Sequence, residues 1–292
     1  MPELPDVTIY VEALRRHVVG AKVLDVRIRN PFLVRTVDPP LDAIVGKSIE
    51  DVERFGKRIV LAVEGDLFVV IHLMIAGRLL WRGPKAKVPA KIGLLALDFE
   101  HGSLILTEAG TKRRASIHVA CGREALSTHD PGGLEVIESS IEEFASRLRS
   151  QNHTIKRALT DPKLLSGIGN AYSDEILHAA KLSPMLWTSR LDDDQIKRLH
   201  DAVRSVLIEW TDRLREQFGE RFPDKGEITA HREDFAVHNR FGKPCLKCGA
   251  TVQRIRYKDR ETNYCPTCQT GGKKLSDRSL ARLLKDDWQD CD

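Results

Sequence analysis

The spacing of apolar side chains changes along the chain, and each change marks a different kind of element. Near the start, apolar residues recur every three or four positions, the period of a helix with one buried face. Asp6 is a suitable N-cap for this helix, and Gly20 is a suitable stop. We therefore expect a leading helix whose buried face carries Val7, Tyr10, Val11, Leu14 and Val18.

Short apolar runs separated by Gly, Pro, Asp and Lys follow this helix. Runs of this length and spacing are typical of strands in a sandwich or barrel. The loop from Gly83 to Lys91, with three lysines, is expected to be exposed and basic. We expect eight strands, over Val23–Ile28, Ser48–Arg54, Arg58–Val63, Leu67–Ile71, Arg78–Trp81, Leu94–Phe99, Leu104–Thr107 and Ser116–Val119.

The second half of the chain returns to helical spacing after Pro131-Gly132-Gly133, which is typical of a linker. Phe218 to Val237 is polar and is expected to be a long loop of the functional or mobile kind. In the tail after Gly272, we expect a helix that packs Leu280, Leu283, Leu284 and Trp288 against the body. The other expected helices are Ile141–Arg149, Ile155–Leu159, Asn170–Ala180 and Asp192–Gln217.

Composition narrows the class of protein without deciding it. The 292 residues, of which 41% are hydrophobic and 30% charged, suffice for two soluble domains. A net charge of +4 and a pI near 8.7 permit a nucleic-acid partner but do not require one. Because the sequence has neither a membrane-spanning apolar run nor a signal pattern, we expect a cytoplasmic protein without membrane contacts. In that compartment, Cys121 and Cys291 are expected to be free thiols.

The remaining four cysteines form two Cys-x-x-Cys pairs, Cys245 with Cys248 and Cys265 with Cys268. Two such pairs at this separation predict one tetrahedral site for Zn²⁺ with four thiolate ligands. The site has no open position for water, so the metal is expected to stabilise a small β-hairpin and not to be catalytic. The hairpin between the pairs is rich in cations, which suits phosphate contacts, although zinc ribbons also bind proteins.

The first residues combine a nucleophile with an acid. If Met1 is removed, Pro2 carries a free secondary amine, and α-amino groups titrate at about 7.7–8.0. Such an amine attacks sugar or carbonyl carbons, and its adduct is an iminium cation, which is a good electron sink. Glu3 beside it is suited to moving protons. On these residues alone, a merely stiff start peptide is the favoured interpretation.

A second candidate site lies where a helix is expected to begin. Gly167 and Gly169 precede Asn170, which predicts a tight turn with open backbone amides at a helix N-terminus. That geometry suits phosphate, but the Gly-x-Gly pattern alone is a weak signal. Glu175 on the same helix is expected to be solvated, like most helix glutamates; the alternative is a hydrogen-bonding role toward the N-terminal region.

Pro2-Glu3-Leu4-Pro5-Asp6-Val7 resembles the N-terminal signature of the formamidopyrimidine-DNA glycosylase and endonuclease VIII family of base-excision enzymes. Later stretches resemble the same family in the right order, as far as about Thr270. These stretches are Gly56-Lys57, His72-Leu73-Met74-Ile75-Ala76-Gly77, Leu164 to Tyr172 and the two cysteine pairs. The resemblance implies a bifunctional DNA glycosylase and abasic-site lyase with one structural Zn²⁺ and no catalytic metal.

The resemblance also implies roles for residues at matching positions. Pro2 would attack C1′ and displace the base, Glu3 would protonate the sugar ring oxygen, and Lys57 would support catalysis from a turn. β- and δ-Elimination through the Schiff base at Pro2 would then cleave the strand. The residues that would hold phosphates are His72, Lys156, Asn170 and Arg260.

Two stretches depart from the family pattern. Met74 would fill the gap left by the extruded base, but it stands one place before the methionine of the family's His-Leu-x-Met-x-Gly. Purine-specific members carry Asp-Pro-Arg-Arg-Phe-Gly in a hairpin, where this chain has Thr107 to Arg114 without phenylalanine. Lys112 and Arg113 there form a basic cluster that either meets phosphate or is simply solvated. The departure leaves open whether oxidised purines or oxidised pyrimidines are the substrate.

These observations predict an α+β fold, with an N-terminal β-sandwich and leading helix, a helix-two-turn-helix bundle and a C-terminal zinc-ribbon β-hairpin. The expected parts are a catalytic domain over residues 1–130, a DNA-binding domain over 131–239, the ribbon over 240–270 and a tail over 271–292. The expected partner is double-stranded DNA with oxidised bases or abasic sites, bound by a monomer associated with the nucleoid. The alternatives are a non-catalytic nucleic-acid-binding protein and a zinc-ribbon interaction module.

Overall fold

The structure is a computed structural model of the chain, and it describes residues 1–110, 112–229, 231–257 and 260–275. Contacts between residues divide the chain into two compact units. Unit 1 comprises Met1–Glu135, Pro162–Ile168 and Leu207–Ala230, and unit 2 comprises Val136–Asp161, Gly169–Val206 and His231–Asp292. Because each unit joins segments that are distant in sequence, the four-part division along the chain stays a prediction. The predicted tail helix and Cys291 lie outside the described residues.

The leading helix, α1, spans Leu4–Val18, so the prediction that Asp6 is its N-cap is wrong. Glu3 is the N-cap, and Asp6 accepts a hydrogen bond from the Glu3 backbone N–H at 2.9 Å. The Glu3 side chain accepts in turn from the Asp6 backbone, which completes a capping box. Pro5 is tolerated because an amide hydrogen in the first turn has no acceptor within the helix. The helix therefore begins among the residues that carry the candidate chemistry.

Unit 1 contains two four-stranded antiparallel sheets, with strand orders β1-β6-β7-β5 and β2-β3-β4-β8. All eight predicted runs are strands, with ends shifted by two residues or fewer. Their bounds are β1 Asp25–Ile28, β2 Ile49–Phe55, β3 Arg58–Val63, β4 Leu67–His72, β5 Gly77–Arg82, β6 Gly93–Phe99, β7 Gly102–Glu108 and β8 Ser116–Cys121. Short elements that the pattern missed are α2 Gly122–Ser127 and the 3-10 helices Pro31–Leu33, Leu41–Ile44 and Thr188–Arg190, the last of which is in unit 2.

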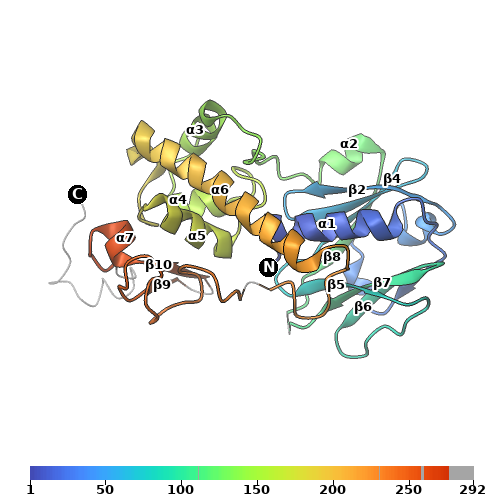
Figure 1. Cartoon of the computed structure of the whole chain (residues 1–292). Coiled ribbons are helices and arrows are strands. Elements are labelled where there is room, and N and C mark those ends of the chain that lie inside the picture. The colour runs from blue at the N-terminus through green and yellow to red at the C-terminus, as the bar shows by residue number, and fades with distance from the viewer. Residues whose placement is uncertain (111, 230, 258–259, 276–292) are drawn as a thin grey trace. The chain divides into compact units, whose positions relative to one another are not determined.

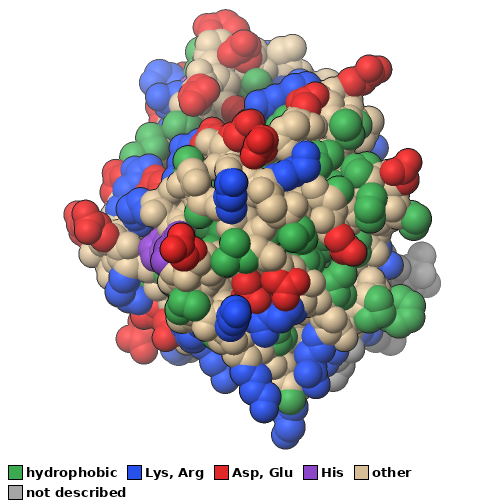
Figure 2. Space-filling model, turned by 90° about the vertical axis from the view of Figure 1, so that its right-hand side faces the viewer, with side chains coloured by type: hydrophobic (Ala, Val, Ile, Leu, Met, Phe, Trp, Pro, Cys, Tyr) green, Lys and Arg blue, Asp and Glu red, His purple; other side chains and the backbone are tan. Residues whose placement is uncertain are grey.

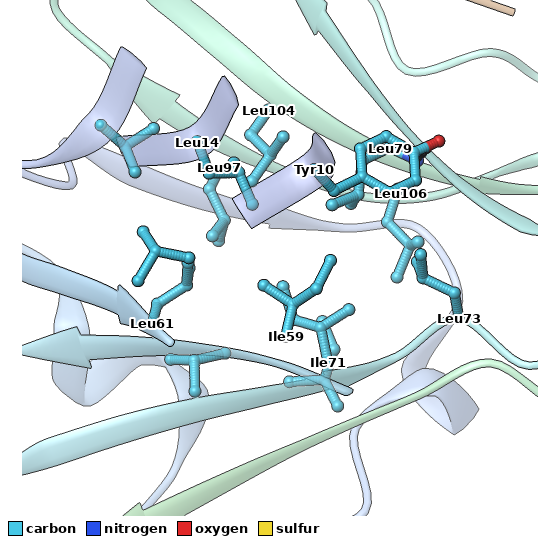
Figure 3. Packing of buried hydrophobic residues seen from close by; sticks show 14 of the residues in the cluster. Tyr10, Leu14, Ile59, Leu61, Ile71, Leu73, Leu79, Leu97, Leu104 and Leu106 are labelled. Atoms are coloured by element: carbon cyan, nitrogen blue, oxygen red, sulfur yellow. Dashed lines mark hydrogen bonds between the residues drawn. The ribbon is translucent and has the colours of Figure 1, made fainter. Parts of the chain in front are cut away.

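The core of unit 1 lies between α1 and the two sheets (Figure 1). Tyr10 and Leu14 reach into it from α1, and leucine and isoleucine side chains of both sheets point toward one another there (Figure 3). Full burial of each such side chain stabilises the fold by about 1.5–3 kcal/mol. The predicted β-sandwich with a leading helix is therefore confirmed.

Strand register brings several turns of unit 1 to one end of the sandwich. In one sheet, Arg58 on β3 pairs with His72 on β4, and His72 pairs with Ser116 on β8. In the other sheet, Gly77 at the start of β5 pairs with Glu108 at the end of β7. The β2–β3 turn, the β4–β5 turn and the segment between β7 and β8 therefore leave the sheets at the same end.

Unit 2 contains the predicted helices and the ribbon. α6 spans Asp193–Phe218, and its second half, from Leu207, belongs to unit 1. The ribbon hairpin pairs β9 with β10, and a short helix, α7, follows it. The bounds are α3 Ile141–Arg149, α4 Ile155–Thr160, α5 Asn170–Ala180, β9 Gln253–Tyr257, β10 Arg260–Tyr264 and α7 Pro266–Thr270. The predicted α+β class and its order of parts are confirmed.

The described surface is charged and mixed. Figure 2 shows lysine and arginine side chains gathered toward the lower end of one face, with acidic and apolar side chains scattered above them. Lys85, Lys87 and Lys91 are exposed, as predicted for that loop, and Cys121 is an exposed free thiol. Among the described residues, no helix combines the length and the apolar character needed to cross a membrane.

Candidate functional site

The start of the chain is buried and held by a backbone contact. Pro2, Glu3 and Leu4 are all buried, and Leu4 N–H donates to the carbonyl oxygen of Gly167 at 2.9 Å. Gly167 has a φ of +79°, and a Cβ there would lie 2.7 Å from the Leu4 Cβ, so only glycine fits. The segment Pro162–Ile168 therefore fixes where the first residues lie within unit 1.

Four charged side chains act on the N-terminal amine of Met1. Burial lowers the pKa of this amine from its ordinary value of 8.0; Glu3 acts to raise it, Arg78 to lower it, Asp6 to raise it and Lys57 to lower it. Because the net effect is a lowered pKa, more of the amine is uncharged at neutral pH than at a solvated chain start. An uncharged amine beside a carboxylate is suited to nucleophilic attack with proton transfer.

Lys57 lies in the turn between β2 and β3, where Gly56 has a φ of +58°. Its Nζ donates to the carbonyl oxygen of Ile168 at 2.8 Å. Burial lowers the pKa of Lys57, while the neighbouring carboxylate of Glu3 raises it. The structure therefore brings the three residues predicted to be catalytic, Pro2, Glu3 and Lys57, together within unit 1.

His72 ends β4 and lies half-buried between two strands, opposite Arg58 and Ser116. Burial is the largest cause that lowers the pKa of His72 to about 4, and the charges of Arg58, Lys57 and His118 contribute to the same shift. The ring is therefore neutral at pH 7, and a neutral imidazole still offers one N–H donor to a phosphate oxygen.

The turn between β4 and β5 presents a different apolar residue from the one expected. Met74 has a φ of +52° and is half-buried, whereas the Ile75 side chain is 62% exposed. Arg78 braces this turn, because its guanidinium donates to the carbonyl oxygens of Gly77 at 2.7 Å and Ile75 at 3.2 Å. It also donates to Ile228 at 2.6 Å. The sequence analysis did not identify Arg78 as a site residue. Ile75 could have been identified, because it occupies the position of the methionine in the family's His-Leu-x-Met-x-Gly.

Glu108, the last residue of β7, holds the segment between β7 and β8. Glu108 is buried, and its carboxylate accepts the backbone N–H groups of Arg114 at 3.0 Å and Ala115 at 3.1 Å. Lys112 and Arg113 between them are exposed. Both predicted cations are thus accessible, on a tethered segment whose sequence has no aromatic residue.

Two predicted phosphate ligands lie together in unit 2. Asn170 is the first residue of α5, and Lys156 on α4 donates to its carbonyl oxygen at 2.7 Å. Lys156 also forms an ion pair with the buried Asp174 at 2.5 Å. The Asn170 amide donates to the carbonyl oxygen of Glu261 at 2.9 Å, which ties α5 to the ribbon. Arg260 begins β10, and its side chain lies outside what the structure describes.

Glu175 is buried, so the expectation that it is solvated is wrong. Its carboxylate accepts backbone N–H groups from Ala236 at 2.7 Å, Val237 at 2.9 Å and His238 at 2.8 Å. Burial raises the pKa of Glu175, against the lowering effect of these three hydrogen bonds. Glu175 therefore anchors the end of the long segment that follows α6, through a contact between residues about sixty positions apart that local sequence cannot reveal.

The predicted zinc ligands converge in unit 2. Cys248 Sγ lies 3.4 Å from Cys265 Sγ, and Cys245 Sγ lies 4.0 Å from Cys268 Sγ, separations that fit thiolates around one tetrahedral ion. Two of these cysteines are buried, which fits a structural Zn²⁺ and not an open catalytic one. His178 of α5, which sequence reasoning missed, places its Nε2 3.3 Å from Cys245 Sγ.

Three family models match the chain in order. The formamidopyrimidine-DNA glycosylase N-terminal domain matches residues 1–116, and the H2TH domain of the same glycosylases matches residues 133–213. The zinc finger found in FPG and IleRS matches residues 242–271. The matched regions include every predicted site residue.

Individual relatives agree with these matches. The formamidopyrimidine-DNA glycosylase of Solibacter usitatus is 31% identical over 271 residues, covering 92% of this chain and 99% of the relative. An uncharacterised formamidopyrimidine-DNA glycosylase-like protein of Mycobacterium tuberculosis is 44% identical over 154 residues, which are 52% of this chain and 94% of the relative.

Solved structures show the same likeness. Lactococcus lactis Fpg in complex with abasic-site DNA superposes with a TM-score of 0.80 at 25% identity, over 92% of this chain and 99% of that one. MutM in complex with DNA that contains carbocyclic 8-oxo-G gives the same TM-score of 0.80 at 25% identity, over 92% of this chain and 100% of that one.

Replacement of Glu175 by alanine is expected to free the segment around residues 236–238. Hydrogen bonds to a charged group each contribute about 1.5–3 kcal/mol, so amide hydrogen exchange there should accelerate roughly tenfold or more. Exchange followed by mass spectrometry measures the change. Glu216→Ala, at an exposed position of α6, is the matched control. Equal exchange in both variants would mean that Glu175 does not anchor the segment.

Proposed function

The chain belongs to the formamidopyrimidine-DNA glycosylase family, and we propose that its buried start, once Met1 is removed, is the nucleophile with which it excises damaged bases. The protein is a base-excision repair DNA glycosylase with abasic-site lyase activity. The observation that carries the proposal is the burial of Pro2 and Glu3 beside Lys57, in surroundings that lower the pKa of an amine at the chain start.

The first chemical step breaks one bond and makes another at C1′ of the damaged nucleotide. The base must first leave the stack, which costs roughly a few kcal/mol. This cost is smallest for a damaged base. The lone pair of the Pro2 nitrogen then attacks C1′, the base departs with the electrons of the glycosidic bond, and Glu3 protonates the sugar ring oxygen. Ring opening leaves an iminium ion between Pro2 and C1′.

The iminium ion makes the second step possible. It acidifies the 2′ position, and loss of a 2′ proton expels the 3′ phosphate by β-elimination; a further elimination expels the 5′ phosphate. Lys57 adds positive charge beside the reacting sugar, and Glu3 shuttles the protons. Because Lys57 is anchored on Ile168, its charge is already in place before the substrate arrives.

The remaining predicted site residues would position the DNA. Support for His72, Lys112 and Arg113 as phosphate contacts comes from their place at one end of the sandwich of unit 1. Asn170 stands at a helix N-terminus, which favours anions. Lys156 is already paired with Asp174, so we assign it mainly to holding the backbone of Asn170. Arg260 keeps its assignment as a phosphate ligand of the ribbon.

The proposed substrate is double-stranded DNA with an oxidised base or an abasic site. Similar solved structures contain DNA with an abasic site, with Fapy-dG or with carbocyclic 8-oxo-G, which supports this class. Because the segment from Thr107 to Arg114 has no aromatic residue, the proposal does not extend to one particular base. We further expect the protein to act as a monomer in the cytoplasm, at the nucleoid and away from membranes.

A covalent trap tests the nucleophile. When the processed protein is mixed with an abasic duplex and borohydride, the iminium should be reduced to a permanent adduct at residue 2, located by peptide mass spectrometry. Protein that retains Met1 is the matched control: its Pro2 nitrogen is a tertiary amide, so no adduct should form at residue 2, and peptide mapping distinguishes an adduct at the Met1 amine. If duplex is bound but no adduct forms, the protein binds damaged DNA without catalysing its cleavage.

The pH dependence of trapping tests the surroundings of the amine. The surroundings lower the pKa of the Met1 amine, and we expect them to act in the same way on the Pro2 amine once Met1 is removed. Neutral amine increases as pH rises through its pKa, so the trapping rate should rise with pH and level off, with a midpoint below 8.0. In Arg78→Met the midpoint should move up, since the positive charge of Arg78 lowers this pKa. Affinity for an abasic duplex is measured in parallel, because Arg78 also braces the β4–β5 turn. If the substitution leaves the midpoint unchanged, the charge of Arg78 does not lower the pKa of the amine.

Ile75, and not Met74, is expected to fill the gap left by the extruded base. Proteins that kink DNA insert exposed apolar side chains between bases, and Ile75 is the exposed member of this pair. Truncation by Ile75→Ala removes about 2 kcal/mol of apolar contact, which corresponds to excision from a lesion-bearing duplex roughly tenfold slower or more. Met74→Ala is the matched control, and a single-stranded substrate should be cut equally by both variants. A larger loss in Met74→Ala would restore the original assignment.

A further inference from the structure

One face of α5 is bound to the ribbon along its whole length. Asn170, Asp174 and His178 are spaced four residues apart and therefore share a face of the helix. Asn170 donates to Glu261 at 2.9 Å, and Asp174 accepts from the Asn263 side chain at 3.3 Å. His178, the last of the three, faces Cys245 at 3.3 Å. The proposed phosphate ligand Asn170 and the zinc ligands thus lie at opposite ends of one stripe.

His178 is buried among the thiols. Its side chain is 1% exposed and that of Cys245 is 3% exposed. The ligand atoms of His178, Cys245, Cys265 and Cys268 all lie within 4.8 Å of one another. An imidazole nitrogen that carries a proton is a donor, and a thiolate sulfur is an acceptor, so the 3.3 Å separation suits an N–H to sulfur hydrogen bond.

We propose that His178 is a positioning residue of the zinc site, whose Nε2–H donates a hydrogen bond to the Cys245 thiolate and so couples the ribbon to α5. The two Cys-x-x-Cys pairs already supply four ligands, so the imidazole is not needed on the metal. Four thiolates around Zn²⁺ carry a net charge of about −2, and a buried donor offsets part of it. Removal of such a partner typically weakens metal binding by about 10–100-fold.

The proposed hydrogen bond acts directly on metal binding and only indirectly on DNA binding. α5 rises about 1.5 Å per residue, so His178 stands about 12 Å along the axis from Asn170. Loss of the hydrogen bond at one end should loosen the ribbon there, while the Asn170–Glu261 and Asp174–Asn263 bonds still hold the rest of α5 to it. The effect on zinc requires neither DNA nor catalysis, so its failure would be distinct from a failure of the proposed function.

Zinc retention in His178→Phe and His178→Gln tests the proposal. Phenylalanine fills the space without a donor, and we expect zinc transfer to a chromophoric chelator about 10–100-fold faster than in the unaltered protein. Glutamine keeps an N–H donor and should restore much of the retention. His200→Phe is the matched control, because His200 is a buried histidine of the same unit, bonded to the Ser139 carbonyl oxygen. Zinc loss from His178→Phe at the unaltered rate would overturn the proposal.

Cobalt substitution separates a hydrogen-bond donor from a ligand. With Co²⁺ in place of Zn²⁺, the unaltered protein and His178→Phe should both give the absorption of four thiolates, and Cys248→Ser should lose metal. A spectrum of three thiolates and one imidazole in the unaltered protein, with metal retained in Cys248→Ser, would show that His178 is itself the fourth ligand. Either part of that result would refute the outer role proposed here.

Discussion

Burial of the chain start is the constraint on which the chemistry depends. A terminal amine in water is mostly protonated at neutral pH and moves freely, so it is a poor nucleophile. Here the capping box of Glu3 and Asp6 fixes the first turn of α1, and the Leu4–Gly167 bond fixes the turn against unit 1. The same burial lowers the pKa of the Met1 amine, and we expect the same effect on the Pro2 amine, so that position and reactivity share one physical cause.

Charge is distributed differently in the two units. Around the Met1 amine, Glu3 and Asp6 act to raise its pKa, whereas Arg78 and Lys57 act to lower it. In unit 2, Lys156 is compensated by the buried Asp174, so that ion pair is a structural support for Asn170. A buried pair of this kind contributes little net stability, but breaking one partner leaves a costly unpaired charge.

The match between expectation and structure was best where short-range rules decide. Short apolar runs separated by Gly, Pro, Asp and Lys predicted all eight strands of unit 1, because run length and turn residues are local signals. The start of α1 was misplaced because Glu3 can cap a helix through Asp6 even though Pro5 intervenes. Glu175 was expected in solvent, because no residue near it in sequence indicates that the backbone of residues 236–238 donates hydrogen bonds to it.

The sequence by itself determined the α+β class and the cysteines of the zinc site, and its resemblance to a known family supplied Pro2, Glu3 and Lys57 as the proposed catalytic residues. Motif spacing suffices for these because ligands and catalytic groups are matched one residue at a time. Only the tertiary structure decided that Ile75 is more exposed than Met74, that Arg78 braces their turn, and that His178 meets Cys245. Exposure and contacts between distant residues depend on how elements pack, and no local pattern of side chains encodes that packing.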